Sequence, residues 1–114
     1  MSAFVDAARR GEVEILKKIA NQDGFDANQT EAKTGFTALH AATAWRNTAT
    51  IHWLLSNTSI DPRIRDIAGR RAIDIVMHIS EVNHKRVIEE ATYAKALLRA
   101  ETKLQLLDRN IDRG

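Results

Sequence analysis

The feature that most constrains this chain is an internal repeat of about 35 residues. Three segments align over their full length: 4–19, 39–54 and 73–88. Their first residues are separated by 35 and then 34 positions. Periods of about 20 to 50 residues are typical of arrays in which each unit packs only against its neighbours. The sequence therefore predicts a stack of similar units within one chain of 114 residues.

A turn separates each aligned segment from the next. Residues 25–28 precede the second segment and residues 60–63 precede the third, and each turn leads to a glycine, Gly35 or Gly69. Glycine suits a backbone position where φ is positive, and Pro62 cannot stand inside a helix. One extra residue before Gly35 accounts for the unequal offsets, because loops tolerate insertions.

Apolar residues within each unit follow helical spacing. In the second unit they recur at steps of three and four within two short stretches: Leu39 and Ala42, then Ile51, Leu54 and Leu55. This is the pattern of helices that bury one face. Each unit is therefore predicted to consist of two short helices and a turn. Such a unit can bury its apolar face only by stacking on another unit.

Three stretches match the motifs of one known repeat family. Residues 37–42 read Thr-Ala-Leu-His-Ala-Ala and resemble the Thr-Pro-Leu-His-x-Ala signature of the ankyrin repeat. Residues 65–75 look like the ankyrin stretch Asp-x-x-Gly-x-Thr-Pro-Leu-His/Asp-x-Ala, and residues 7–16 look like its helix–turn–helix half. The resemblance implies an all-α solenoid of stacked helix pairs with hairpin-like turns. It covers residues 1–90, with repeats at about 3–32, 33–66 and 67–90.

The sequence departs from the ankyrin pattern at several positions. Ala38 stands where proline is usual, and Arg71 replaces the usual threonine. Arg46 and Ser80 replace the glycine between the two helices of a repeat, which Gly11 retains. The third unit diverges most, as terminal repeats do because one of their faces meets water.

The resemblance also implies a binding surface. Ankyrin proteins bind partner proteins with their hairpin tips and inner helices. Carried over to this sequence, that surface, here called the ridge, consists of Lys33, Thr34, Phe36, Ala44, Trp45, Ile67, Ala68, Arg70, His78 and Ile79. We therefore expect a module that binds another protein.

Trp45 is the most informative residue of the ridge. The resemblance places it at the end of an inner helix, where a polar residue would suffice for solubility, and large aromatic side chains dominate interface energetics. The alternative is that Ile79 and the neighbouring repeat cover the ring. We expect Trp45, Phe36 and Ile79 to supply apolar contact with the partner and Arg70 to orient it. Trp53 follows the apolar spacing of the outer helix and is expected in the core.

A cluster of arginines spans the boundary between the second and third repeats. Arg63, Arg65, Arg70 and Arg71 lie close to three aspartates in the sequence. One interpretation is a solvated hairpin with internal ion pairs. The other is a site for an anion or an acidic partner, contacted by Arg63, Arg65 and Arg71, because guanidinium groups bind carboxylate and phosphate through paired hydrogen bonds.

Residues 91–114 form a C-terminal extension within the same domain. Neither glycine nor proline occurs from Ser80 to Arg113, and the composition favours a long helix. Apolar residues recur at heptad-like spacing, namely Leu97, Ala100, Leu104, Leu107 and Ile111. Two interpretations stay open. The helix folds back as a cap on the last repeat, or it pairs with its own copy or a partner through Leu97, Leu104, Leu107 and Ile111, which would make the chain an oligomerising or scaffolding subunit.

The residues that carry chemistry elsewhere show no catalytic pattern here. The family resemblance implies that His40 orders its turn by hydrogen bonding with Thr37. His78 and His84 are six residues apart, which does not place them on one helix face. The chain has no cysteine and no glycine-rich phosphate loop after a strand. We therefore predict neither catalytic residues, nor a metal site, nor a cofactor.

Charge and composition limit the class of partner and the cellular compartment that we expect. The net charge of +2 lacks the strong excess typical of nucleic-acid binders, so such a partner is not expected. No apolar run reaches the length of a membrane span. The absence of cysteine fits a reducing compartment, so we expect a cytoplasmic protein, and a secreted effector is also compatible.

Overall fold

Short helices arranged in pairs make up the repeats. The computed structural model describes the backbone of residues 2–76 and 87–112 and the side chains of residues 2–76 and 95–108. The described helices are α1 (Ala3–Arg10), α2 (Val13–Ala20), α3 (Ala38–Ala44), α4 (Thr48–Asn57) and α6 (Val87–Asp112), and residues 72–76 are also helical. No strand occurs in these stretches. The all-α solenoid with a long C-terminal helix is therefore confirmed.

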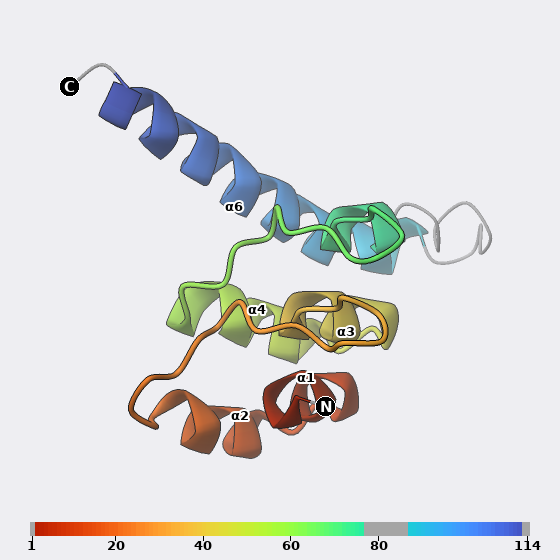
Figure 1. Cartoon of the computed structure of the whole chain (residues 1–114). Coiled ribbons are helices and arrows are strands. Elements are labelled where there is room, and N and C mark those ends of the chain that lie inside the picture. The colour runs from red at the N-terminus through yellow and green to blue at the C-terminus, as the bar shows by residue number, and fades with distance from the viewer. Residues whose placement is uncertain (1, 77–86, 113–114) are drawn as a thin grey trace.

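The helix pairs stack in layers. Figure 1 shows α1 and α2 in one layer, α3 and α4 in the next, and helix 72–76 with α6 in the third. Among the described helices, the inner helices α1 and α3 make the largest set of contacts, and α4 packs against α6. The loops 21–37 and 58–71 run along one side of the stack and supply the hairpin-like turns.

The turn between the helices of each pair needs a left-handed residue. Gly11 has φ +73° after α1, and its N–H group bonds to the last carbonyls of that helix. Arg46 adopts φ +60° at the corresponding place after α3, although arginine has a Cβ that disfavours this conformation. The packing of the stack holds Arg46 in this left-handed conformation despite its cost in backbone strain.

The turn that opens α3 is ordered by Thr37 and His40. The Thr37 N–H group donates to Nδ1 of His40 over 3.1 Å, and the Thr37 hydroxyl oxygen lies 2.9 Å from the same nitrogen. Because an N–H group can only donate, Nδ1 is the acceptor and the ring proton lies on Nε2. Nε2 then donates to the carbonyl oxygen of Arg70 over 2.7 Å. The predicted structural role of His40 is confirmed, and the ring also links the second repeat to the third.

The hairpins stack directly on each other at Gly35. The N–H group of Ile67 donates to the carbonyl oxygen of Thr34 over 2.9 Å. A Cβ atom on Gly35 would lie 2.8 Å from that same Ile67 nitrogen, and Gly35 has φ +71°. Only glycine satisfies both the backbone angle and the close approach.

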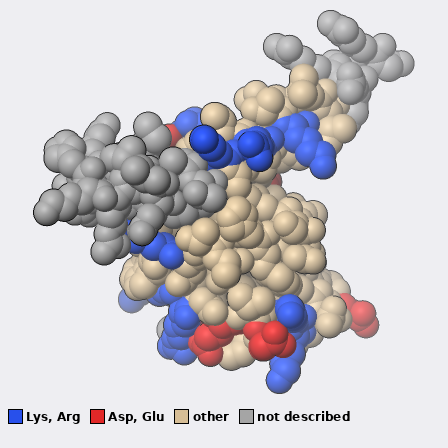
Figure 2. Space-filling model, turned by 180° about the vertical axis from the view of Figure 1, so that it is seen from behind, with Lys and Arg blue, Asp and Glu red and all other residues tan. Residues whose placement is uncertain are grey.

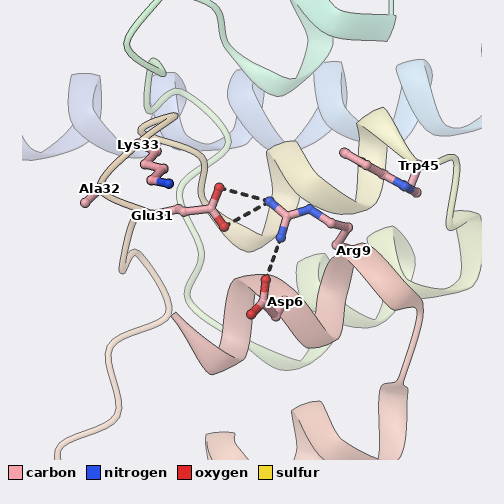
Figure 3. Close-up of a pocket in the computed structure, with 6 residues that line it drawn as sticks. All are labelled: Asp6, Arg9, Glu31, Ala32, Lys33 and Trp45. Atoms are coloured by element: carbon pink, nitrogen blue, oxygen red, sulfur yellow. Dashed lines mark hydrogen bonds and ion pairs between the residues drawn. The ribbon is translucent and has the colours of Figure 1, made fainter. Parts of the chain in front are cut away.

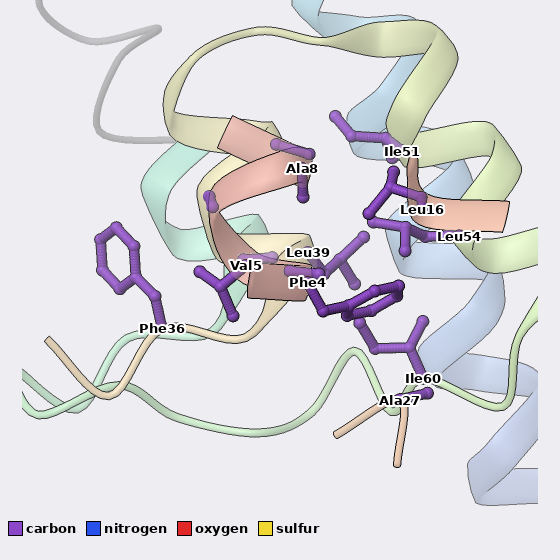
Figure 4. Packing of buried hydrophobic residues seen from close by; sticks show 14 of the residues in the cluster. Phe4, Val5, Ala8, Leu16, Ala27, Phe36, Leu39, Ile51, Leu54 and Ile60 are labelled. Atoms are coloured by element: carbon purple, nitrogen blue, oxygen red, sulfur yellow. The ribbon is translucent and has the colours of Figure 1, made fainter. Parts of the chain in front are cut away.

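The core runs between the layers. Phe4, Leu16, Leu39, Ile51 and Leu54 are fully buried, and Figure 4 shows them converging between α1, α3 and the outer helices. At roughly 2 kcal/mol for each large side chain, this burial is the main favourable term holding the layers together. Trp53 is half-buried and packs against this cluster from its edge, so its expected place in the core is met only in part.

The long helix α6 covers the last repeat. It is continuous past residue 90, and Leu97 is fully buried in the core cluster. Arg71 donates to Glu101 over 2.9 Å, and Arg63 donates to Asp108 over 2.7 Å. These contacts correspond to the cap interpretation.

The heptad-spaced residues of α6 that were predicted to associate are here called the seam; they are Leu97, Leu104, Leu107 and Ile111. Leu97 is buried, so its predicted role in association is wrong: the side chain already fills the interface between α6 and the repeats. Leu104 is half-buried and Leu107 is exposed. The side chain of Ile111 lies outside the described residues. None of the helices described here is both long and apolar enough to cross a membrane.

Candidate functional site

An open pocket lies where the first hairpin meets the ends of the inner helices. It has a volume of about 520 Å³, and its lining residues come from α1, the first hairpin and the end of α3. These residues are Asp6, Arg9, Glu31, Ala32, Lys33 and Trp45. Figure 3 shows Lys33, Ala32 and Glu31 on one side, Trp45 on the other, and the side chain of Arg9 between them.

Arg9 organises the pocket. Its Nη2 group donates to both carboxylate oxygens of Glu31, over 3.0 and 2.9 Å, and its Nη1 group donates to Asp6. Each carboxylate thus fixes one side of the guanidinium group. Such charge-assisted bonds are stronger than neutral ones and hold the planar group in one orientation. The pocket therefore has a rigid floor that joins α1 to the hairpin.

The contact with Arg9 lowers the pKa of Glu31. Its burial would raise the pKa of the carboxyl group, but hydrogen bonds from Arg9 and Thr34 and the charge of Arg9 outweigh burial, so the pKa lies below its usual value. The Thr34 hydroxyl donates to Glu31 over 2.9 Å and accepts from the Phe36 N–H group. Glu31 stays ionised near neutral pH and orders the hairpin as well as the pocket.

Trp45 supplies the apolar wall. The residue ends α3 as its C-cap, and its side chain is 56% exposed. The guanidinium carbon of Arg9 lies 5.2 Å from the ring centroid, a distance at which a cation is attracted to an aromatic face. A large ring is therefore presented to solvent beside Arg9.

Comparison with known families identifies the repeats. A family model described as "Ankyrin repeats (3 copies)" matches residues 1–66, which is more than half of the chain. This chain belongs to the ankyrin-repeat family. Ankyrin repeats are protein-interaction modules, and the fold is generally non-enzymatic. A comparison with curated proteins gave no match.

Two solved structures share the ankyrin fold of this chain. The ankyrin domain of AnkB from Legionella pneumophila is 27% identical, with a TM-score of 0.69, and the match covers 87% of each chain. A chain in the complex of a predatory endopeptidase with an immunity protein from Bdellovibrio bacteriovorus is 22% identical, with a TM-score of 0.67. The match covers 88% of this chain but 46% of that chain, so this ankyrin chain spans less than half of its length.

The predicted ankyrin ridge is partly assembled in the structure. Lys33 and Trp45 line the pocket, and Thr34 holds Glu31 beside it. Ala44 is half-buried. Ile67 is 70% exposed at the tip of the second hairpin, next to exposed Ala68. His78 and Ile79 lie outside the described residues.

Phe36 departs from the prediction. The side chain is 9% exposed, and its ring stacks on His40 with a centroid distance of 5.4 Å. Arg70 covers it, with the guanidinium carbon 6.0 Å from the ring centroid, while its Nε group donates to buried Asp66. Phe36 is therefore not surface for a partner, because stacking of the hairpins encloses the ring. Arg70 remains half-exposed above it.

The arginines of the cluster form hydrogen bonds with groups of this chain. Hydrogen bonds from Arg63 hold the pKa of Asp61 below its usual range, and those from Arg71 do the same for Asp74. Both arginines also contact α6, whereas Arg65 is exposed and donates to the carbonyl oxygen of Gly69. The acidic groups that Arg63 and Arg71 contact are thus this chain's own carboxylates, which come from their sequence neighbours and from α6.

Sequence reasoning missed four of the lining residues, Asp6, Arg9, Glu31 and Ala32. Arg9 and Glu31 are 22 positions apart, and no local period links them. The one available signal was an acidic residue shortly before the hairpin tip and an arginine at the end of the inner helix. Within the described part of the chain, no cluster of three or more His, Cys, Asp or Glu side chains could hold a metal ion.

Proposed function

We propose that this ankyrin chain binds a partner protein by accepting an apolar side chain of that partner against Trp45, with a partner carboxylate at Lys33. The observation that carries the proposal is the half-exposed Trp45 ring at the wall of a pocket. A soluble protein gains nothing from exposing so large an apolar ring, and tryptophan is among the residues most enriched at the centres of interfaces.

The pocket favours this chemistry because its arginine is already paired, whereas its lysine is not. Arg9 is held by two carboxylates and is not available to a partner anion. Lys33 is exposed on the rim and forms no ion pair with a described residue. A carboxylate of the partner would therefore meet Lys33, while an apolar neighbour contacts the ring.

Rigidity supports tight binding through a small surface. The Arg9 bonds fix the floor, and the hairpin stacking fixes the rim, so few rotamers are lost when a partner docks. Exposed Ile67 and Ala68 on the second hairpin extend the surface beyond the pocket. Lys33, Trp45, Ile67 and Ala68 are the residues of the ankyrin ridge that this proposed surface uses.

A peptide-display selection against the intact chain tests the proposal. We expect enriched peptides to carry an apolar residue near an acidic one. Trp45→Ala should weaken their binding by about 2 kcal/mol, or roughly 30-fold in Kd, as expected of a central aromatic contact. Lys33→Glu should weaken it further by charge repulsion. Both are measured by calorimetry or fluorescence anisotropy on chains with unchanged circular dichroism.

Two control variants match these changes in kind. Ile15→Ala removes an exposed apolar side chain from α2, and Lys18→Glu reverses an exposed charge there. Neither residue lines the pocket, so both variants should bind as the unmodified chain does. Peptides that bind the Trp45→Ala chain with unchanged affinity would contradict the proposal.

The alternative function is an oligomerising or scaffolding subunit that associates through the C-terminal helix. That function needs the seam formed by Leu97, Leu104, Leu107 and Ile111. Leu97 is buried between α6 and the repeats, so the seam lacks its first residue for association, although Leu107 is exposed. The partner-binding pocket is therefore the function that we propose.

A further inference from the structure

Within residues 95–108, the part of α6 whose side chains are described, the charged residues are sorted between the two faces of the helix. Glu101 and Asp108 point to the repeats, where they accept hydrogen bonds from Arg71 and Arg63. The bases stand on the other side and are exposed: Lys95, Arg99 and Lys103. The acids of this segment are thus used for packing, and a purely basic set is left toward solvent.

The outer face consists of two parallel rows. One row is basic and contains Lys95, Arg99 and Lys103, and the other contains Leu98, Thr102 and Leu106. Members of each row are four residues apart, a rise of about 6 Å, and the rows lie side by side because residues three and four apart are neighbours on a helix. Leu98 and Leu106 are each 54% exposed. Figure 2 shows blue side chains running along α6.

The basic row has no acidic partner in the described part of the chain. The ion pairs of α6 there involve only Glu101 and Asp108, and none reaches the three bases. A polar cap needs hydrophilic residues on its outer face, but it does not need leucines beside them or charges of one sign. The face therefore presents charge and apolar area in matching rows.

We infer that the outer face of α6 binds an acidic amphipathic helix of a partner protein. Rows at intervals of four residues form ridges with a groove between them, and a second helix packs by inserting its own ridge into that groove. Carboxylates at matching intervals would pair with the bases, and apolar side chains would cover Leu98 and Leu106. This surface is separate from the pocket at Trp45 and does not depend on it.

The two other anionic surfaces fit less well. A membrane-surface helix needs a broad apolar face opposite its charged one. In α6 the exposed leucines lie beside the bases, and Leu97 on the opposite face is buried in the core. Nucleic acid would meet the bases with phosphates, but a phosphate backbone offers nothing apolar to Leu98 and Leu106.

The test uses the full chain and a stapled helical peptide with glutamate and leucine rows at intervals of four residues. Binding is measured by fluorescence anisotropy at low and at physiological salt. Reversal of the basic row, Lys95→Glu with Arg99→Glu and Lys103→Glu, should weaken binding about tenfold or more. Neutralisation of the same residues to glutamine should give an intermediate loss. A peptide with lysine in place of glutamate should regain binding to the reversed chain.

A matched control makes the same change in net charge elsewhere. Arg10→Glu with Lys17→Glu and Lys18→Glu reverses three exposed bases of the first repeat. This variant and Trp45→Ala should bind the peptide within about twofold of the unmodified chain. The inference is overturned if the peptide does not bind, or if the control loses as much affinity as the α6 variant. It is also overturned if phosphatidylserine vesicles or duplex DNA bind through the α6 bases and the peptide does not.

Discussion

At the residue scale, His40 joins three parts of the stack with one ring. Its two nitrogens contact Thr37 at the start of α3 and the carbonyl of Arg70 in the next hairpin, and Phe36 stacks on its face. Burial lowers the pKa of His40 below its ordinary value of 6.5. The hydrogen bond to Arg70 opposes this shift but is outweighed. The neutral ring is therefore the form that the fold accepts.

The buried ring predicts a loss of stability in mild acid. Because the folded pKa is below that of the unfolded chain, the unfolded state binds a proton first as pH falls through about 6.5. The free energy of unfolding should be fully retained above that pH and should decrease below it, by at most about 1.4 kcal/mol per pH unit for one proton. Urea denaturation across this range measures the slope.

Two histidine variants show which residue causes this pH dependence of the free energy of unfolding. His40→Gln should remove most of it while lowering the overall stability, and His52→Gln, an exposed change on α4, should leave it in place. The lowered pKa values of Glu31, Asp61, Asp66 and Asp74 act in a separate window, below about pH 4.5. An unchanged slope in His40→Gln would show that another group carries the effect.

The side chain of Asn47 also connects two repeats. Its Nδ2 group donates to the carbonyl oxygens of Ala8 and Arg9, over 3.0 and 2.8 Å, and so completes the end of α1. Asn47→Ala should lower the free energy of unfolding by about 1–3 kcal/mol, because two carbonyl groups each lose a hydrogen bond, although the N–H group of Gly11 still reaches Ala8. Asn57→Ala removes one exposed bond to Trp53 and should cost far less. Equal losses on chemical denaturation would refute the assignment.

At the element scale, the hairpins are positioned by two glycines in different surroundings. Gly35 and Gly69 have φ +71° and +79°, but a Cβ on Gly69 would meet nothing within 4 Å. Gly69→Ala should therefore cost only the backbone strain, about 1–2 kcal/mol. Gly35→Ala adds a contact of 2.8 Å with the Ile67 nitrogen and should cost at least about 1 kcal/mol more. Thermal and chemical denaturation of the two variants gives the difference, and equal costs would mean that the hairpins separate readily.

At the scale of the whole molecule, α6 is the element that closes the stack. Leu97 and Leu98 are neighbours in sequence, but Leu97 is fully buried and Leu98 is 54% exposed. Leu97→Ala should lower the free energy of unfolding by about 2–5 kcal/mol, whereas Leu98→Ala should change it by about 0.5 kcal/mol or less. Helix propensity is nearly the same in both variants, so the difference measures the docking of α6. Equal stabilities in urea denaturation would mean that α6 is not held on the repeats.

Local patterns were enough to predict the repeats themselves. Helical spacing within each unit predicted α1 to α4. The resemblance to the ankyrin motif implied the bond between Thr37 and His40 and the place of Trp45 at the end of an inner helix. Each of these features depends on residues within a few positions of each other. Period and turn chemistry are sufficient for such features because they act along the chain.

Only the tertiary structure decided which surfaces remain open. The ring of Phe36 was enclosed by His40 and Arg70, and Arg9 became the floor of a pocket because the stack brought Glu31 to it across 22 positions. Arg63 donates to Asp108, which is 45 positions away in the sequence. An arginine that suggested an anion site therefore helps to hold α6 on the repeats. The sequence by itself determined the unit and its stacking. The distances between units, which decide burial and ion pairing, follow only from the packed array.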